Sequence, residues 1–187
     1  YPTYLTFFST AAKIAIAGVP FPLATEKPTR RDALTYYRSV VSHLGLQVRQ
    51  YEPVTEILRR RQGFVVRSHP TGGDVVQTEA HAIVIATGYF GTPNSLDVPG
   101  EELPHVSHLY REGHGAFQRD VIVVGGGNSA AESALDLWRS GARVTLVHFG
   151  PTFDKNIKPW VLPDLQNRLT DGSIQVRWNT RLTAIEP

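Results

Sequence analysis

The chain has 187 residues, of which 41% are hydrophobic and 19% charged, and its formal net charge is +2. This balance is typical of a folded protein and excludes a largely disordered chain or a strongly basic nucleic-acid binder. Because the sequence contains no cysteine, disulfides, thiolate metal sites and a redox dithiol within this chain are excluded as well. The lack of cysteine fits a cytoplasmic protein. No apolar run approaches the roughly 20 residues of a membrane span and no signal-peptide pattern is present, so we expect no membrane partner.

The first predicted helix follows an aromatic, proline-rich opening. Thr29 and Asp32 form a T-x-x-D capping box at its start, and Gly45 supplies the stop. Between them an apolar stripe recurs at helical spacing, formed by Leu34, Tyr37, Val41 and Leu44.

Short β-runs follow, separated by turn residues: LQVRQ (46–50), VTEILRR (54–60), GFVVRSH (63–69) and DVVQTE (74–79). The basic run Arg59-Arg60-Arg61 precedes the first turn, and we interpret it as a solvated hairpin tip, not a nucleic-acid patch. The apolar run HAIVIATG (81–88) predicts a buried parallel strand.

A proline- and glycine-rich stretch, GTPNSLDVPGEELP, marks the end of one domain. We therefore predict two domains, residues 1–104 and residues 105–187. Three histidines, His105, His108 and His114, lie close to this boundary, but their spacing does not match a zinc pattern. We expect ordinary hydrogen-bonding histidines in a hinge and assign no metal site.

The second domain begins with a strand–helix–strand unit, predicted at 120–124, 128–140 and 143–147. A further helix is predicted at 163–169, followed by strands at 174–178 and 182–185.

Between the first strand and helix of this unit lies a glycine loop of the form G-x-G-x-x-A. Gly125 allows the tight turn, Gly127 lets backbone amides approach a pyrophosphate, and Ala130 lets helix and strand pack closely. The helix N-terminus offers free N–H groups to phosphates. Because the loop follows a strand and opens a helix in a unit of about 30 residues, it predicts a dinucleotide-binding site.

The choice of nucleotide depends on the end of the second strand, where an acid would bind the ribose hydroxyls of NAD or FAD. His148 stands there, and the next acid, Asp154, lies well into the following loop. Lys155 and Lys158 are in that loop. The missing acid and nearby cations favour the 2′-phosphate of NADP(H), although both lysines could also be solvated loop charges.

These residues resemble the FAD- and NAD(P)H-dependent pyridine nucleotide-disulfide oxidoreductases of the thioredoxin-reductase type. HAIVIATGYFGTPNSLDVPG is similar to the family's A-T-G strand and its crossing between domains, and GGGNSAAESALDL is similar to its NADPH loop. The opening YPTYLTFFST and the helix segment TYYR resemble the bacillithiol-disulfide reductase branch. The resemblance implies an α/β, Rossmann-like FAD/NAD(P)-binding fold: a partial FAD lobe with a β-meander plus an inserted NADPH lobe.

The resemblance also implies roles for individual residues. Ala86, Thr87 and Gly88 would lie against FAD, with the Val54 backbone beside its adenine. The NADPH pyrophosphate would be held by Gly125, Gly127, Asn128, Ser129 and Ala130. Glu132 would approach the nicotinamide side, although it could equally be a helix N-terminal charge favoured by the dipole.

Several departures from the family pattern matter. The family's C-x-x-C pair is absent from HLYREGHGAFQRD, so the chain cannot pass electrons to thioredoxin by that route, and we assign it no catalytic residue. The family's H-R-R is replaced by His148-Phe149-Gly150. The family's first glycine loop and its final flavin-contacting segment are also missing, and no methionine is present, so we expect an internal part of a longer flavoprotein.

The resemblance implies an oxidoreductase that passes hydride from NADPH to FAD and on to a disulfide, plausibly of a low-molecular-weight thiol. A redox-protein substrate and a homodimer are also expected from the family. Three alternatives stay open: a flavin-dependent monooxygenase, a ferredoxin–NADP reductase of the same fold, and a non-catalytic NADP-binding fragment.

Overall fold

The computed structural model describes residues 2–88, 91 and 93–187. Within the family-like motif of the sequence, Tyr89, Phe90 and Thr92 lie outside the described residues. None of the helices in the described part of the chain is long and apolar enough to cross a membrane.

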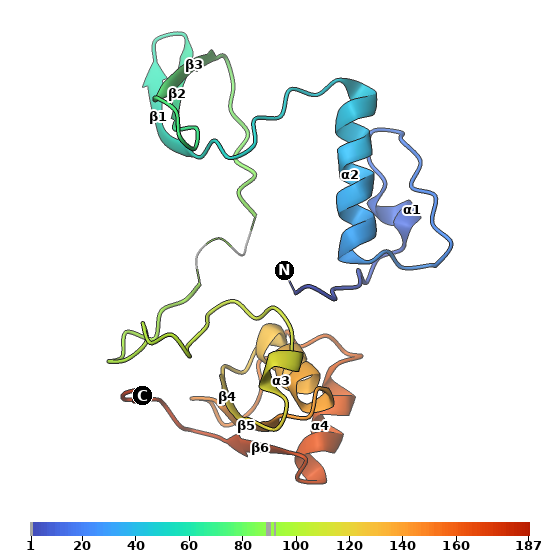
Figure 1. Cartoon of the computed structure of the whole chain (residues 1–187), viewed down its shortest axis with the longest axis vertical. Helices are drawn as coiled ribbons and strands as arrows, with labels where there is room; N and C mark the ends of the chain where they lie inside the picture. Colours follow the sequence, from blue (N-terminus) through green and yellow to red (C-terminus); the bar gives the residue numbers. More distant parts are fainter. Residues whose placement is uncertain (1, 89–90, 92) are drawn as a thin grey trace. The chain divides into compact units, whose positions relative to one another are not determined.

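The chain forms two compact units (Figure 1). One unit is Thr6–Gly91, and the other combines Tyr1–Leu5 with Thr92–Pro187. The units therefore divide the chain after Leu5 and again after Gly91. The assignment of cofactor domains to 1–104 and 105–187 stays a prediction.

The long helix of the first unit, α2 (Arg30–Leu44), confirms the predicted helix and its capping box. The Asp32 backbone N–H donates to Thr29 Oγ1 (3.3 Å), and the Thr29 N–H donates to the Asp32 carboxylate (2.9 Å). The Thr29 hydroxyl also donates to this carboxylate (2.7 Å), and this hydrogen bond, followed by the one from the Thr29 N–H, lowers the pKa of Asp32. Gly45 ends the helix in the left-handed conformation, with φ of 62°.

The buried face of α2 differs from the predicted stripe. Ala33, Tyr36 and Val40 are buried, whereas Leu34 is 47% exposed. The Tyr36 hydroxyl explains the rotation, because it accepts the Ile16 N–H (2.8 Å) and hydrogen-bonds the chain that wraps the helix after α1 (Ala11–Ile14). The apolar spacing predicted the position of the helix correctly. The hydrogen bonds of the Tyr36 hydroxyl determine which face of the helix is buried.

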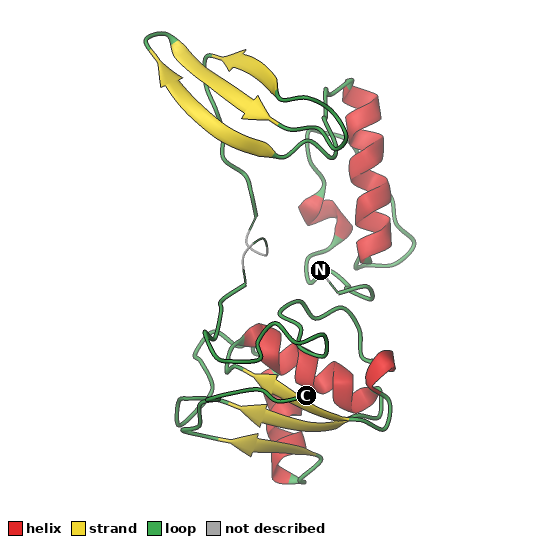
Figure 2. Cartoon of the chain, turned by 60° about the vertical axis from the view of Figure 1, so that its left-hand side comes forward, coloured by secondary structure: helices red, strands yellow, loops and turns green. Residues whose placement is uncertain are grey.

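A three-stranded antiparallel sheet completes the unit, with the order β1 (Val54–Arg60), β2 (Gly63–Ser68) and β3 (Val76–Ala80). Arg60 pairs with Gly63, so the basic run lies at a two-residue hairpin turn, as predicted. Figure 2 shows these strands side by side.

Two predicted strands of this unit are absent from the structure. Residues 46–50 and 81–88 form no strand, and Val84 is 88% exposed. A parallel strand needs a hydrogen-bonded neighbour, and no strand in the described part of the chain pairs with 81–88. The apolar pattern was therefore wrong as a prediction of local structure.

The second unit confirms the predicted strand–helix–strand core. Its parallel sheet has the order β4 (Asp120–Val124), β5 (Arg143–Val147) and β6 (Ile174–Arg177). The crossovers are α3 (Asn128–Arg139) and α4 (Leu162–Thr170), drawn beside the sheet in Figure 1.

The apolar faces of α3 and α4 meet the sheet in one core. Ala134, Leu146 and Leu165 are fully buried at its centre, together with Ile174 of β6. Residues 182–185, predicted as another strand, form none, and the Ile185 N–H instead donates to the Pro99 carbonyl (2.8 Å).

Candidate dinucleotide-binding site

The glycine loop joins β4 to α3 at the carboxyl edge of the parallel sheet. The Gly125 N–H donates to the Val147 carbonyl (2.9 Å), which fixes the loop to the end of β5. Gly125 has a φ of 139°, and a Cβ there would lie 3.3 Å from the Ala130 methyl group. The predicted reasons for glycine and alanine at these positions are thus visible in the structure.

Gly127 is the N-cap of α3, in an extended conformation and without a side-chain cap in the described structure. The first-turn N–H groups of a helix have no partner within the helix itself. With Asn128 half-buried and Ser129 exposed beside Gly127, this end of α3 has the donors that a pyrophosphate requires.

Gly126, the middle glycine, is also a required glycine, although sequence analysis assigned it no role. A Cβ at this position would lie 2.4–2.5 Å from three atoms of the His148 imidazole. Because the His148 ring lies so close to the backbone of Gly126, no residue with a side chain fits at position 126. The signal in the sequence was the unbroken run of three glycines, because G-x-G-x-x-A needs only the first and the third and leaves Gly126 unexplained.

His148 directly follows β5, at the position where an acid would bind a ribose, but the residue is buried and only 3% exposed. Its N–H donates to the Arg177 carbonyl (3.0 Å), and its ring packs edge-on to Trp178. The imidazole Nδ1 has no hydrogen-bond partner among the described residues. His148 therefore supports the glycine loop from the inside, and its assignment to the cofactor stays a prediction.

Asp154 lies closer to the loop than its place in the sequence indicated. Its N–H donates to the Gly126 carbonyl (3.0 Å), and its carboxylate lies 3.9 Å from the His148 Nε2. A Cβ on Gly127 would lie 3.3 Å from its Oδ2. No acid directly follows β5, as the sequence indicated, but in the folded site Asp154 lies next to the glycine loop.

Polar side chains connect the first turn of α3 to the segment before α4. Lys158 Nζ pairs with Glu132 Oε1 (2.7 Å), and Asn128 Nδ2 donates to Glu132 Oε2 (2.9 Å). The Lys158 N–H donates to Asn128 Oδ1 (3.1 Å). Glu132 thus engages one of the two lysines proposed for a 2′-phosphate, whereas Lys155 is exposed.

The predicted flavin-side residues lie in the other unit. Val54 begins β1 and pairs with Ser68, and the side chain of Val54 is exposed. Ala86, Thr87 and Gly88 are exposed and belong to no strand. The structure does not pair Val54 with these three residues, and their contacts to FAD stay predictions.

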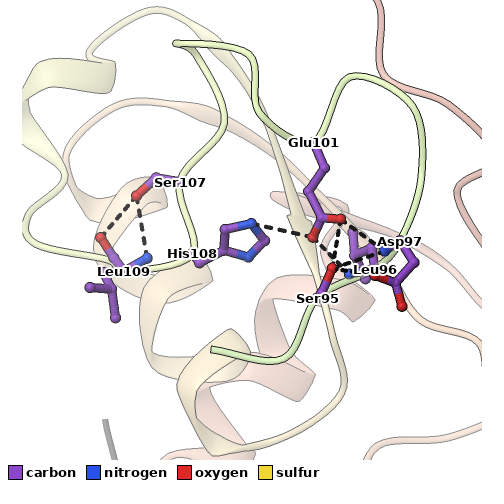
Figure 3. Close-up of polar contacts among 7 residues, drawn as sticks. All are labelled: Ser95, Leu96, Asp97, Glu101, Ser107, His108 and Leu109. Atoms are coloured by element: carbon purple, nitrogen blue, oxygen red, sulfur yellow. Dashed lines mark hydrogen bonds and ion pairs between the residues drawn. The ribbon is translucent and has the colours of Figure 1, made fainter. Parts of the chain in front are cut away.

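A carboxylate organises the segment that precedes β4 (Figure 3). Glu101 accepts the N–H groups of Leu96 (2.7 Å) and Asp97 (2.8 Å) and pairs with His108 Nε2 (3.3 Å). The N–H of Leu96, followed by the Ser95 hydroxyl, holds the pKa of Glu101 below its usual value against the effect of burial. The His108 imidazole thus lies in polar contact with a carboxylate, in keeping with an ordinary hydrogen-bonding histidine.

Comparison with known proteins agrees with this geometry. A family model described as pyridine nucleotide-disulphide oxidoreductase matches residues 1–187. Bacilliredoxin reductase Bdr of Bacillus subtilis (strain 168) is 40% identical over 179 residues, which cover 95% of this chain and 54% of that protein.

Two solved structures are similar over the whole chain. Bacillithiol disulfide reductase Bdr from Bacillus cereus is 41% identical with a TM-score of 0.95, and the match covers 100% of this chain and 57% of that one. The corresponding enzyme from Staphylococcus aureus is 39% identical with a TM-score of 0.88, covering 100% and 56%. The chain thus spans about half the length of the relatives that it matches.

These similarities confirm the predicted α/β, Rossmann-like fold and the family resemblance found in the sequence motifs. The glycine loop, the parallel sheet around it and the match over all 187 residues lead to one conclusion. The chain belongs to the pyridine nucleotide-disulphide oxidoreductase family.

Proposed function

We propose that the protein is an oxidoreductase that uses NADPH and FAD to reduce a disulfide of a low-molecular-weight thiol, such as bacillithiol disulfide. The overall reaction consumes one NADPH and one proton per disulfide and yields NADP⁺ and two thiols. The observation that carries the proposal is the dinucleotide loop at the β4–α3 junction, in a chain 40% identical to a bacilliredoxin reductase.

The chain's own residues bind and orient the cofactors, which supply the redox chemistry. In this proposal Gly125, Gly127 and the first residues of α3 bind the pyrophosphate through backbone N–H groups. The buried His148 ring supports the middle of the loop at Gly126. Its Nδ1 has no hydrogen-bond partner among the described residues, so this nitrogen can make a further polar contact in the nucleotide complex. Residues 86–88 and Val54 lie on the flavin side.

The protein's surroundings are part of the same proposal. A chain without cysteine suits the reducing cytoplasm, where disulfides are rare. The basic residues at the β1–β2 turn lie on an exposed hairpin tip, which gives no broad surface for nucleic acid. We also propose a homodimer, on the family resemblance.

The test uses the protein that carries this chain, at its natural length and with its flavin bound. Anaerobic stopped-flow mixing with NADPH should bleach the flavin, with an affinity at least about tenfold higher than for NADH. Bacillithiol disulfide added to the reduced protein should restore the flavin colour and release two thiols per NADPH.

Two results would contradict the proposal. Failure of either nicotinamide nucleotide to bleach the flavin would remove the oxidoreductase assignment. Rapid reoxidation by ferredoxin or by oxygen, with no effect of the disulfide, would assign the protein to one of the two flavoenzyme alternatives.

A further inference from the structure

An arginine lies against an exposed phenylalanine just beyond the carboxyl end of β5. The guanidinium carbon of Arg181 is 4.6 Å from the centroid of the Phe149 ring. Phe149 is 60% exposed, and Arg181 is exposed as well. A guanidinium stacked in this way keeps its hydrogen-bonding edge available for a second partner.

Backbone hydrogen bonds fix the position of this pair. The Thr180 N–H donates to the His148 carbonyl (3.0 Å), and the Asn179 N–H donates to the Gly150 carbonyl (3.1 Å). The segment after β6 therefore runs alongside the segment after β5. Arg181 is distant from Phe149 in the sequence, but the sheet holds both residues at one edge.

No carboxylate in the described part of the chain forms an ion pair with Arg181, whereas Lys158 is paired with Glu132 at 2.7 Å. A cation held at the carboxyl end of the parallel strands, with no acidic partner among the described residues, is suited to an anion from solution. An arginine also matches the geometry of a phosphate better than a lysine does, because its fork can donate two parallel hydrogen bonds.

The carboxyl end of the second strand is where a dinucleotide unit distinguishes its ribose. An acid there binds the 2′-hydroxyl of NAD, and an arginine nearby accommodates the 2′-phosphate of NADP. His148, which occupies that position, is buried against Gly126 and cannot present its ring to a ribose. We infer that Arg181, stacked on Phe149, binds the 2′-phosphate of NADP(H) and sets the cofactor preference.

This inference rests on the proposed function and names the residue that gives it nucleotide specificity. It differs from the assignment based on sequence, which placed the 2′-phosphate on Lys155 and Lys158. If Arg181 binds the 2′-phosphate, its substitution should reduce the preference for NADP⁺ over NAD⁺. If Lys155 and Lys158 bind it, their substitution should do so instead, and equilibrium binding measured without turnover distinguishes the two cases.

The experiment is calorimetric titration of the protein that carries this chain, at its natural length and with its flavin bound, with NADP⁺ and, separately, with NAD⁺. The wild type should bind NADP⁺ more tightly. Arg181→Ala should weaken NADP⁺ binding about ten- to hundredfold, the range for one hydrogen-bonded charge, and leave NAD⁺ binding within about twofold. Phe149→Ala should weaken NADP⁺ binding less, because the cation remains and only its support is lost.

Arg119→Ala is the matched control. Arg119 precedes β4, at the opposite edge of the sheet, where its carbonyl accepts the Arg143 N–H (2.8 Å). Its removal deletes the same charge without touching the β5 edge and should leave both affinities unchanged. Circular dichroism checks that each variant is folded.

Each result has one meaning. If the wild type prefers NADP⁺ and Arg181→Ala keeps the preference, while Lys155→Ala with Lys158→Ala removes it, the loop lysines select the phosphate and Arg181 does not. If the wild type binds NAD⁺ as tightly as NADP⁺, or prefers it, the inference falls and Asp154 becomes the residue that reads the ribose. If the wild type binds neither nucleotide, the proposed function itself fails.

Discussion

At the scale of single residues, the middle glycine of the loop has a specific physical role. Gly126 leaves the space that the His148 ring fills, and the ring in turn lies beneath the loop expected to bind phosphate. His148, at the position where an acid would bind a ribose, is therefore a packing residue. Its contribution to the site is the shape of the loop.

Gly126→Ala should destabilise this unit and weaken nucleotide binding. The new methyl group would overlap the His148 ring, and overpacking of this kind costs about 1–3 kcal/mol. Chemical denaturation and NADP⁺ titration measure the two effects. Gly115→Ala is the control, since a Cβ there has no neighbour within 4 Å and should change neither.

The origin of this effect can be tested with a second substitution. Adding His148→Ala to Gly126→Ala removes the overlap, so the double variant should lose less stability than the two single changes added together. Strict additivity would mean that the ring and the glycine do not interact.

Glu101 predicts a dependence of stability on pH. Its pKa is held below the ordinary glutamate value in the folded chain, chiefly by the N–H of Leu96. A carboxyl group with a depressed folded pKa stabilises the protein above its unfolded pKa, and this contribution is lost as the pH falls through the folded pKa. Glu101→Gln should therefore lower the melting temperature at pH 7, and the difference should shrink below about pH 4.

Thermal melts at a series of pH values provide the measurement. Glu102→Gln is a neighbouring control, because Glu102 is exposed, and it should give no comparable difference. A constant gap between wild type and Glu101→Gln from pH 7 to pH 3 would show that ionisation of Glu101 does not contribute.

At the scale of elements, α2 depends on its capping box. Thr29→Ala removes the hydroxyl that accepts the Asp32 N–H, and loss of such a cap costs about 0.5–2 kcal/mol. Hydrogen exchange of the first-turn amides should accelerate accordingly. Thr35→Ala, inside the same helix, should instead be neutral or slightly stabilising, because alanine is the better helix former. Equal losses from both changes would contradict a role of the cap.

The elements that could be predicted from the sequence are those with local signals. The capping box located α2, the glycine run located the β4–α3 junction, and the dipeptide Gln62-Gly63 located the β1–β2 turn. Each of these signals lies within a few residues of the structure it specifies. The family motifs also led to the correct fold, which the match to a solved reductase confirms.

The elements that could not be predicted depend on partners distant in sequence. Residues 81–88 have the composition of a buried strand, but hydrophobicity does not reveal whether a neighbouring strand exists to pair with them. The same limit applies within the site. The proximity of Asp154 to Gly126 and of Arg181 to Phe149 arises from hydrogen bonds between segments, which spacing along the chain does not encode.

At the scale of the whole molecule, the two compact units should respond separately to damage in one core. Leu165 is fully buried between α4 and the parallel sheet, and Leu165→Ala should cost its own unit about 2–5 kcal/mol. Hydrogen exchange should accelerate in α3 and β5 and stay unchanged in α2. Leu109→Ala, at a site 49% exposed, is the matched control and should have a much smaller effect. Equal acceleration in α2 would mean that both units unfold together.

The boundary between the units is not a single point in the chain. Near the N-terminus, the Thr3 N–H donates to the Arg111 carbonyl (2.9 Å), and the Tyr4 ring meets the His114 ring edge-on. The polypeptide therefore passes from one unit to the other twice, after Leu5 and after Gly91. A gene divided at residue 91 would produce two halves that are not two domains, because the first half carries a short strap of the second. Such halves could serve as a split-protein pair, because their association requires the N-terminal strap of the first half to bind the unit formed by the second half.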